Sequence, residues 1–412
     1  PYEASRLGGE EMDEARARIA AMLGVETDEV SFGPSTTQNT YVLAQAFAEM
    51  LKPGDAVIVT DQDHEANSGP WRRLAARGIE LREWKLEPET GHLPLDGLKR
   101  LLDGKVRLVC FPHASNIVAE INPVAEIARL AHAAGAVICV DGVSYAPHGF
   151  PDVGALQADI YLFSAYKTYG PHQGVMVVRR ALAERLPSQG HYFNAGVLYK
   201  RFTPAGPDHA QIAACAGMAD YVDDLYAHHM DFAHGVDGEE NPLPLAGEGR
   251  ARAPQYAPIL PYTPPQPQPL SRRRQRGEEG AAPRSDPQIA SGGAGARERA
   301  AFVHDLMRAR ECELLAPLLD YLATKNSVRV IGPRKVAERM PTVALLLKEP
   351  GADAAARLAA EGVNCGGGDF YAVRCLKAQG IDPGHGVLRL SFVHYTAKAE
   401  IDRLTEALDR AL

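Results

Sequence analysis

Short apolar runs alternate with amphipathic stretches along the first half of the chain. The runs of strand length are Glu29–Phe32, Asp55–Thr60, Leu81–Trp84, Val106–Phe111, Ala136–Val140 and Ile160–Phe163. Between them, apolar residues recur at helical spacing, as in Val124–Ala134. This alternation of strand and helix is typical of βαβ units, so it predicts a mainly parallel sheet.

Helical spacing predicts further helices in the first half of the chain. We expect them over Glu10–Leu23, Tyr41–Leu51, Ala181–Leu186 and Gln211–His229. After a break in composition, the last part of the chain has a different order of elements. A strongly helical run, Arg297–Ala323, is followed by strands at Val328–Ile331, Val343–Leu347 and Val387–Phe392 and by helices at Ala352–Glu361 and Ala397–Leu412. The expected fold class is therefore α/β, with a large parallel-sheet domain and a smaller C-terminal α+β domain.

The composition changes sharply between these two parts. Eleven of the 30 prolines lie between Pro242 and Pro287, in a segment that is also rich in Gly, Arg and Gln. Such a segment buries too little apolar surface to offset its ordering entropy, so we expect a disordered insert. A proline-rich docking ligand and a basic nucleic-acid arm are alternatives. The expected organisation is a large domain over 1–234, the insert over 235–296, and an interdomain helix with the small domain over 297–412.

Composition and charge exclude several classes of function. With 44 Lys and Arg against 52 Asp and Glu, the net charge is −8, which gives no footprint for nucleic acid or a membrane surface. Apolar runs stop far short of a membrane span. The six cysteines have no C-x-x-C spacing, which argues against a zinc site and a disulfide framework. We therefore expect a cytoplasmic protein without a metal.

Two polar side chains follow neighbouring strands at the centre of the chain. Asp141 comes directly after Ala136–Val140, and Lys167 comes shortly after Ile160–Phe163. Carboxyl ends of parallel strands meet at one crevice, so these groups are expected to converge. An amine that forms a Schiff base and a carboxylate that holds a pyridine nitrogen protonated suit pyridoxal phosphate. An ordinary Asp–Lys ion pair at the sheet edge is the alternative.

Other strands also end in polar groups. Gly33–Asn39 places small hydroxyl residues at a strand-to-helix turn, where backbone N–H groups and the helix dipole favour phosphate, although a plain Ser/Thr helix cap is the alternative. His64 follows Asp55–Thr60 and is suited either to stacking on a flat ring or to a structural role. Asn116 follows Val106–Phe111.

The small domain contributes one charged candidate. Arg389 lies inside the apolar strand V-L-R-L-S-F-V. A buried arginine needs an anionic partner, and its planar fork matches a substrate carboxylate. An internal Asp or Glu would serve equally. The glycines Gly366–Gly368 match no dinucleotide-binding pattern, so we expect a flexible loop.

These motifs, taken in order, resemble the class V aminotransferase superfamily of fold type I, and within it the cysteine desulfurase-like branch. The matching motifs are S-T-T, D-H-E-A-N-x-x-P-W, H-A-S-N, V-D-G, F-S-A-Y-K-T-Y-G-P and R-L-S-F-V-H-Y. The resemblance implies that Lys167 forms the Schiff base, Asp141 pairs with the pyridine nitrogen and His64 stacks on the ring. It also implies that Asn116 and Ser144 lie near the ring hydroxyl. Phosphate-binding positions correspond to Thr36, Thr37, Ser164 and Tyr166, and the substrate carboxylate position to Arg389.

The chain departs from this family pattern at several positions. Tyr371 stands where desulfurases have their nucleophilic cysteine, and Cys365 is out of register. Tyr166 and Ser144 replace a usual histidine and glutamine, and Pro207 replaces a threonine that reaches the neighbouring subunit. The chain begins at Pro1 without the family's opening strand and helix, so we expect the N-terminal edge of the large domain to be missing.

The expected function is that of a pyridoxal-phosphate enzyme acting on an amino acid, with C–S lyase or desulfurase-like chemistry favoured. Lys167 would remove the Cα proton and Arg389 would orient the substrate. Transamination and racemisation use the same machinery, and a catalytically impaired homologue with a structural or binding role is a further alternative. The resemblance implies a homodimer, and no nucleic-acid or membrane partner is expected.

Overall fold

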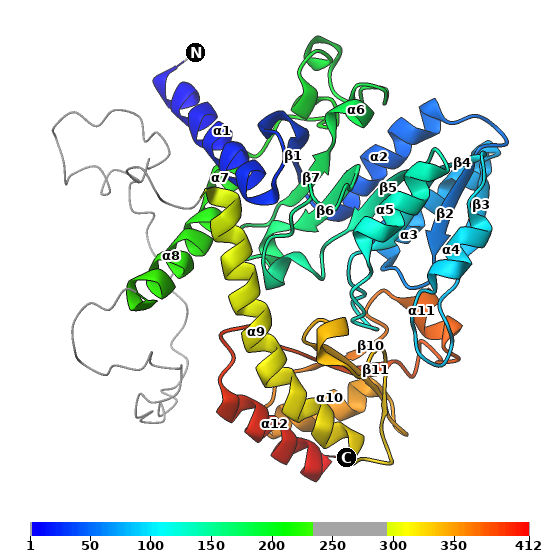
Figure 1. Ribbon diagram of the computed structural model, residues 1–412, viewed down its shortest axis with the longest axis vertical. Helices are drawn as coiled ribbons and strands as arrows, with labels where there is room; N and C mark the ends of the chain where they lie inside the picture. Colours follow the sequence, from blue (N-terminus) through cyan, green and yellow to red (C-terminus); the bar gives the residue numbers. More distant parts are fainter. Residues whose placement is uncertain (1, 234–294, 412) are drawn as a thin grey trace, which may run out of the picture.

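The computed structural model describes residues 2–233 and 295–411. The predicted insert at 235–296 therefore lies outside the described residues, apart from its last two positions. Within the described residues, two sheets and their helices form a large upper part and a smaller lower part, connected by one long helix (Figure 1).

The large sheet contains seven strands among the described residues. They are β1 (Val30–Gly33), β2 (Ala56–Thr60), β3 (Glu80–Trp84), β4 (Val106–Pro112), β5 (Val137–Asp141), β6 (Ile160–Ser164) and β7 (Gly174–Val178). Their order is β1-β7-β6-β5-β4-β2-β3. The five strands β6, β5, β4, β2 and β3 run parallel to one another. At the other end, β7 pairs antiparallel with both β6 and β1. The predicted mainly parallel sheet is confirmed.

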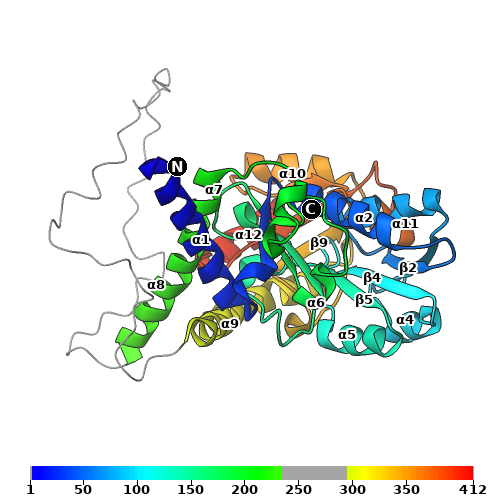
Figure 2. The same cartoon turned by 90° about the horizontal axis from the view of Figure 1, so that it is seen from above.

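Helices cover both faces of this sheet (Figure 2). They are α1 (Glu3–Leu23), α2 (Thr36–Met50), α3 (Glu65–Arg72), α4 (Leu95–Leu101), α5 (Val124–Ala133), α6 (Arg180–Ala183), α7 (His209–Ala214) and α8 (Ala216–Ala233). Alternate residues of β2 belong to different cores, since Val57 lies in the same apolar cluster as Phe47 of α2, whereas Ile58 lies in the same cluster as Ile127 of α5. Strands buried on both faces are continuously apolar, which is why these runs could be found in the sequence.

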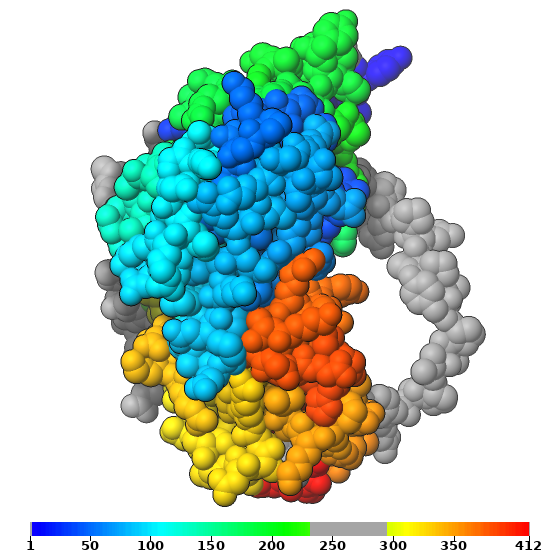
Figure 3. Space-filling model, turned by 90° about the vertical axis from the view of Figure 1, so that its right-hand side faces the viewer, coloured from blue at the N-terminus to red at the C-terminus, as the bar shows by residue number. Residues whose placement is uncertain are grey.

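The small domain is built on an antiparallel sheet of four described strands in the order β10-β11-β9-β8. Its elements are α9 (Ala296–Ala323), β8 (Arg329–Val330), β9 (Thr342–Leu346), α10 (Gly351–Ala360), β10 (Gly366–Gly368), α11 (Val373–Ala378), β11 (Val387–Ser391) and α12 (Lys398–Ala411). One end of α9 packs beside α1 and α8, and its other end packs on α12 (Figure 1). Figure 3 shows the segment around α11, in orange, against the blue and cyan surface of the large domain.

The structure corrects the prediction that Gly366–Gly368 is a flexible loop. These residues form β10, which pairs with β11. A Cβ atom on Gly367 would lie 2.1 Å from the carbonyl oxygen of Gly351. Glycine is needed there because β10 passes very close to α10, and not because the backbone must be flexible.

Four other elements differ from the sequence prediction. Strand β7 and helix α11 were not predicted, and the expected helix over Gln211–His229 is interrupted at Cys215. Helix α1 begins at Glu3 and not at Glu10, although Gly8 and Gly9 disfavour helix. Arg6 forms ion pairs with Glu3 and Glu10 on either side of it, which support this first part of α1.

Candidate active site

All the residues singled out in the sequence as site candidates line one cavity of about 410 Å³, called here the strand-end cavity. They are Thr36, Thr37, His64, Asn116, Asp141, Ser144, Ser164, Tyr166, Lys167 and Arg389. Most of them come from the carboxyl ends of strands in the large sheet, whereas Arg389 lies on β11 of the small domain. The cavity is therefore located between the two domains, at the place where parallel sheets usually bind ligands.

Asp141 and Lys167 do not form the ordinary ion pair that was the alternative interpretation. No ion pair joins them in the described residues. Asp141 is buried at the end of β5, and its Oδ1 accepts a hydrogen bond of 2.9 Å from the Val143 N–H. Burial raises the pKa of Asp141 to about 6, and the positive charge of Lys167 partly opposes this shift. A buried carboxylate and a nearby amine remain available to a ligand.

The turn before α2 leaves its threonine hydroxyls facing the cavity. The helix cap is Ser35, whose Oγ accepts a hydrogen bond of 3.2 Å from the Gln38 N–H. Thr36 Oγ1 lies 2.8 Å from Ser164 Oγ at the end of β6, and Thr37 also lines the cavity. The helix cap is confirmed at Ser35, and the hydroxyls that remain near the positive end of α2 leave the phosphate site a prediction.

His64 has the structural role considered for it and also lies in the cavity wall, so its stacking on a ring stays a prediction. Its Nδ1 accepts a hydrogen bond of 3.0 Å from the Ala66 N–H and so caps α3, and its ring lines the cavity. Burial, with the charges of Lys167 and Arg389, lowers the pKa of His64 to about 4. The imidazole is therefore neutral at pH 7, and its flat ring is suited to stacking on an aromatic ring.

Arg389 has no carboxylate partner in the described part of the chain. Its Nη1 donates a hydrogen bond of 3.3 Å to the carbonyl oxygen of Asn116, and its guanidinium lies 3.9 Å from the centre of the Phe370 ring. Burial lowers the pKa of Arg389. The internal Asp or Glu considered as an alternative is absent here, so the cation is free to bind an anion from the cavity.

The segment after β10 forms part of the cavity wall. Phe370 and Tyr371 both have positive φ angles, 50° and 57°. Asn116 Nδ2 donates to the Phe370 carbonyl oxygen at 3.0 Å, and the Glu65 N–H donates to the Tyr371 carbonyl oxygen at 2.9 Å. These bonds from the large domain hold an unfavourable backbone conformation in place. The Tyr371 side chain is 73% exposed.

Two titratable residues of the wall, Asp63 and His148, were not singled out in the sequence. Asp63 Oδ2 accepts a hydrogen bond of 2.7 Å from Asn67 Nδ2, and burial, with the nearby charge of Asp141, raises the pKa of Asp63 well above its usual value. The position of Asp63 beside His64 is a signal that the sequence offered. For His148 the sequence offers no comparable signal, because its carboxylate partner lies 163 residues away.

The residues of the strand-end cavity fit pyridoxal phosphate. Asn116 Oδ1 and Asp63 Oδ1 are buried without a hydrogen-bond partner, so the cavity wall holds polar atoms that a ligand can satisfy. The cavity also offers the amine of Lys167, which pairs with no carboxylate of the described residues, a buried carboxylate on Asp141 and hydroxyls at the start of α2. These are groups for an aldehyde, a pyridine nitrogen and a phosphate.

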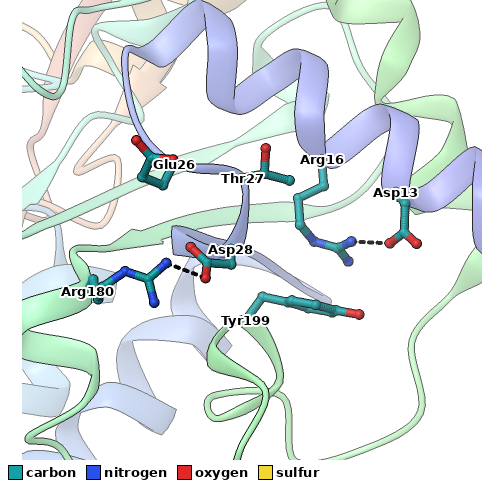
Figure 4. Close-up of a pocket in the computed structure, with 7 residues that line it drawn as sticks. All are labelled: Asp13, Arg16, Glu26, Thr27, Asp28, Arg180 and Tyr199. Atoms are coloured by element: carbon teal, nitrogen blue, oxygen red, sulfur yellow. Dashed lines mark hydrogen bonds and ion pairs between the residues drawn. The ribbon is translucent and has the colours of Figure 1, made fainter. Parts of the chain in front are cut away.

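A second cavity, of about 380 Å³, lies beside α1 (Figure 4). Arg16 Nη1 pairs with Asp13 at 2.6 Å, and Arg180 Nη2 pairs with Asp28 at 2.5 Å. The guanidinium of Arg16 also lies 3.8 Å from the centre of the Tyr199 ring. Both arginines of this cavity are thus paired with carboxylates of the same cavity, whereas Arg389 of the strand-end cavity has no carboxylate partner in the described residues.

The described residues contain neither a membrane-spanning helix nor a metal-binding cluster. No helix there combines the length and apolar character that crossing a bilayer requires. In the same residues, no group of three or more His, Cys, Asp or Glu side chains is arranged to bind a metal ion.

The amino-acid sequence of this chain is similar to those of known proteins. The family model "Aminotransferase class-V" matches residues 2–227. A cysteine desulfurase of Serratia proteamaculans is 35% identical over 232 residues, covering 52% of this chain and 57% of that enzyme. The chain thus spans about half the length of the curated cysteine desulfurases that it matches. An "Aminotransferase-like protein FGM3" of Gibberella zeae is 29% identical over 420 residues, covering 100% of this chain and 85% of that protein.

Solved structures show the same fold. The cysteine desulfurase CsdA of Escherichia coli superimposes with a TM-score of 0.71 at 20% identity, covering 100% of this chain and 86% of that one. A cysteine desulfurase of Thermococcus onnurineus gives a TM-score of 0.73 at 19% identity, with coverages of 99% and 85%. The fold of this chain is therefore that of fold type I enzymes, as the sequence predicted.

Proposed function

The chain belongs to the class-V aminotransferase family, whose members depend on pyridoxal 5′-phosphate, and on this premise we propose that it cleaves the Cβ–S bond of a cysteine-type amino acid. The observation that carries the proposal is the convergence of Lys167, Asp141 and Arg389 on one cavity. The desulfurases among its relatives support the choice of a sulfur-containing amino acid.

Each residue has a task that follows from its position. Lys167 would hold the cofactor aldehyde and then take the proton from Cα, because its amine has no competing carboxylate. Asp141 would hold the proton of the pyridine nitrogen, and His64 would stack on the ring. Pyridoxal phosphate, when bound, supplies a sink for the electron pair left at Cα.

The remaining residues orient the ligands. Thr36, Thr37, Ser164 and Tyr166 would bind the phosphate, with the positive end of the α2 dipole behind them. Asn116 and Ser144 would contact the ring hydroxyl, and Arg389 would bind the substrate carboxylate through its planar fork. The small domain thus supplies the substrate anchor, while the large domain holds the cofactor.

The chain's own thiols argue against the form of the reaction in which the enzyme carries a persulfide. Tyr371 stands at the position of the nucleophilic cysteine, and Cys365 packs against the core of the small domain. Burial raises the pKa of Cys365, which disfavours the reactive thiolate. We therefore expect sulfur to leave directly from the substrate.

Transamination is the second candidate. It is favoured by the full-length similarity to an aminotransferase-like fungal protein. The same residues would serve, because both reactions begin with removal of the Cα proton. A catalytically impaired homologue is the remaining alternative.

Assembly, location and domain organisation belong to the same proposal. We infer a homodimer, supported by the exposed side chains of Tyr192 and Phe193, 91% and 68% exposed, since apolar groups gathered on a surface often mark contacts between chains. A cytoplasmic location is supported by the six free thiols. We further propose a large domain over 1–234, an insert over 235–296, and an interdomain helix with a small domain over 297–412. Light scattering on the purified chain tests the dimer, and a monomer would contradict it.

An absorbance experiment tests the proposed function. The purified chain is mixed with pyridoxal phosphate, beside Lys167→Ala and the control Lys99→Ala, which removes an exposed lysine of α4. The visible band of lysine-bound cofactor should form in the wild type and the control and not in Lys167→Ala. On addition of L-cysteine, sulfide and pyruvate would support the lyase, whereas a keto acid that retains sulfur would support the aminotransferase. Absence of the band in the wild type would contradict both.

A further inference from the structure

His148 is a wall residue of the strand-end cavity that the proposed function leaves unused. It ends the short 3-10 helix η3 (Ala146–His148), which follows Asp141 in the sequence. Its side chain is mostly buried, with the residue 7% exposed. A histidine in the wall of this cavity is placed to contact a substrate.

A buried carboxylate from the other domain orients this histidine. His148 Nδ1 lies 2.6 Å from Glu311 Oε1 on α9. Glu311 is completely buried, and its Oε2 lies 3.3 Å from Arg308 Nη1. Arg308 in turn donates a hydrogen bond of 3.0 Å to the carbonyl oxygen of Arg339. The carboxylate is thus fixed from its far side.

This arrangement determines which ring nitrogen of His148 is left without a hydrogen bond in the described residues. An ionised carboxylate only accepts hydrogen bonds, so the Nδ1 of His148 carries the hydrogen and donates it to Glu311. Within the described residues, Glu311 is the one hydrogen-bond partner of the His148 ring. Nε2 is therefore available to the cavity, and the carboxylate stabilises the imidazolium that forms when Nε2 takes a proton.

We propose that His148, oriented by Glu311, is a second proton carrier of this active site, and that its Nε2 gives a proton to the sulfur that leaves the substrate. His148 is then a catalytic residue and Glu311 a positioning residue. The proposal rests on the proposed C–S bond cleavage and adds the group that assists the leaving thiolate.

In this step Lys167 takes the Cα proton, the electron pair of that C–H bond forms a Cα–Cβ double bond, and the Cβ–S bond breaks with its electron pair on sulfur. The His148 imidazolium transfers its Nε2 proton to this sulfur, which leaves as a thiol. Lys167 then gives its proton to the solvent, and the neutral ring of His148 takes one proton back from the solvent, so that both residues return to their starting states. A strongly basic thiolate is a poorer leaving group than a weakly basic one, so its departure depends more on receiving this proton.

Other polar groups lie around His148, and none of them replaces Glu311. The Tyr169 hydroxyl donates to the carbonyl oxygen of Pro147, the neighbour of His148. His394, which follows β11, lies 2.8 Å from the Tyr221 hydroxyl, and burial lowers its pKa. The Tyr221–His394 contact joins α8 to the segment after β11, whereas the Tyr169–Pro147 bond lies within the large domain.

The first experiment compares two probe substrates with different leaving groups. S-ethyl-L-cysteine releases a strongly basic thiolate and S-(2-nitrophenyl)-L-cysteine a weakly basic one. We expect His148→Asn to slow ethanethiol release by about 10²- to 10⁴-fold and nitrothiophenol release only a few-fold, with cofactor loading unchanged. The matched control is His132→Asn. It removes a histidine whose Nε2 lies 2.8 Å from Asp159 Oδ2 and which does not line the cavity. Equal slowing of both probes, or slowing of neither, would overturn the proposal.

The second experiment does not depend on turnover. Nitrogen-15 NMR of histidine-labelled protein without cofactor should show His148, assigned with His148→Asn, protonated at Nδ1. In Glu311→Gln the amide can donate to Nδ1, so the proton should move to Nε2, and ethanethiol release should fall while nitrothiophenol release does not. A His148 ring protonated at Nε2 in the wild type would overturn the proposal.

The two experiments distinguish a failure of the proposal about His148 from a failure of the proposed function. If the loaded wild-type protein cleaves neither probe, C–S cleavage fails, and the NMR measurement decides the inference about His148. In that case a shift of the His148 Nε2 resonance on addition of L-cysteine to the loaded protein would support a substrate-facing role. An unchanged resonance would overturn it.

Discussion

The hydroxyl oxygens of Thr36 and Ser164 lie 2.8 Å apart, although 128 residues separate them in the chain. Thr36 is the first residue of α2 and Ser164 is the last residue of β6, so this contact joins the positive end of a helix to the carboxyl end of a central strand. The β7 residue Gly174 permits this approach, because a Cβ atom there would lie 2.5 Å from the Thr36 nitrogen. The contact places two hydroxyls where a phosphate is expected.

Thr36→Val tests the role of this pair in phosphate binding. Valine keeps the shape and removes the hydroxyl, so we expect the dissociation constant for pyridoxal phosphate to rise by about 10-fold, the loss of one hydrogen bond to a charged group. The control Thr90→Val removes an exposed hydroxyl that bonds Glu87. Titration followed by visible absorbance gives both constants, and equal values would contradict the assignment.

Asp141 should make the cofactor-free protein less stable as the pH rises. Its pKa is raised to about 6 in the folded protein, so the folded state holds this proton more tightly than the unfolded state. The resulting stabilisation is complete below about pH 4 and is lost as the pH rises through about 6. Asp141→Asn should therefore be more stable than wild type at pH 7, by up to about 3 kcal/mol, and similar to it near pH 4.

Urea unfolding of the cofactor-free protein at several pH values measures this effect. Asp96→Asn is the control, because the pKa of this exposed carboxyl is lowered and not raised. A lower stability of Asp141→Asn at pH 7 would contradict the prediction. With cofactor present the order should reverse, because the amide cannot hold the pyridine nitrogen protonated.

Arg389→Lys should weaken binding of the substrate without affecting the cofactor. Lysine keeps the charge but loses the planar fork and its contact with Phe370, so we expect KM for S-ethyl-L-cysteine to rise by about 10- to 100-fold. Arg374→Lys is the control, since Arg374 pairs with Glu65 and does not line the cavity. An unchanged KM with a reduced kcat would argue against a carboxylate anchor.

Gly8→Ala should stabilise α1. The residue is inside the helix, nothing lies within 4 Å of the Cβ position, and alanine is favoured over glycine in helices by about 1 kcal/mol. Gly24→Ala is the contrasting variant, because Gly24 ends this helix with a φ of +66° and its added Cβ would lie 2.6 Å from Asp152 Oδ1. Thermal unfolding should show a higher Tm for the first variant and a lower Tm for the second.

The sequence by itself predicted six of the seven described strands of the large sheet and ten candidate residues that line the strand-end cavity. Strands buried on both faces are apolar throughout, so the limits of β2, β4, β5 and β6 were found to within one residue, although the equally buried β7 was missed. Parallel strands bring their carboxyl ends to one edge, so the polar residues that follow them could be assigned to one site from their positions in the chain. Asp141 and Lys167 are the clearest examples.

Only the tertiary structure decided features that depend on contacts between distant residues. Gly366–Gly368 has the composition of a flexible loop and becomes a strand because β11 and α10 lie beside it. An internal Asp or Glu as the partner of Arg389 was ruled out because no carboxylate of the described residues reaches it. The pairing of His148 with Glu311 joins two domains across 163 residues. Local patterns report burial and periodicity, whereas which side chains meet depends on how the two domains pack together.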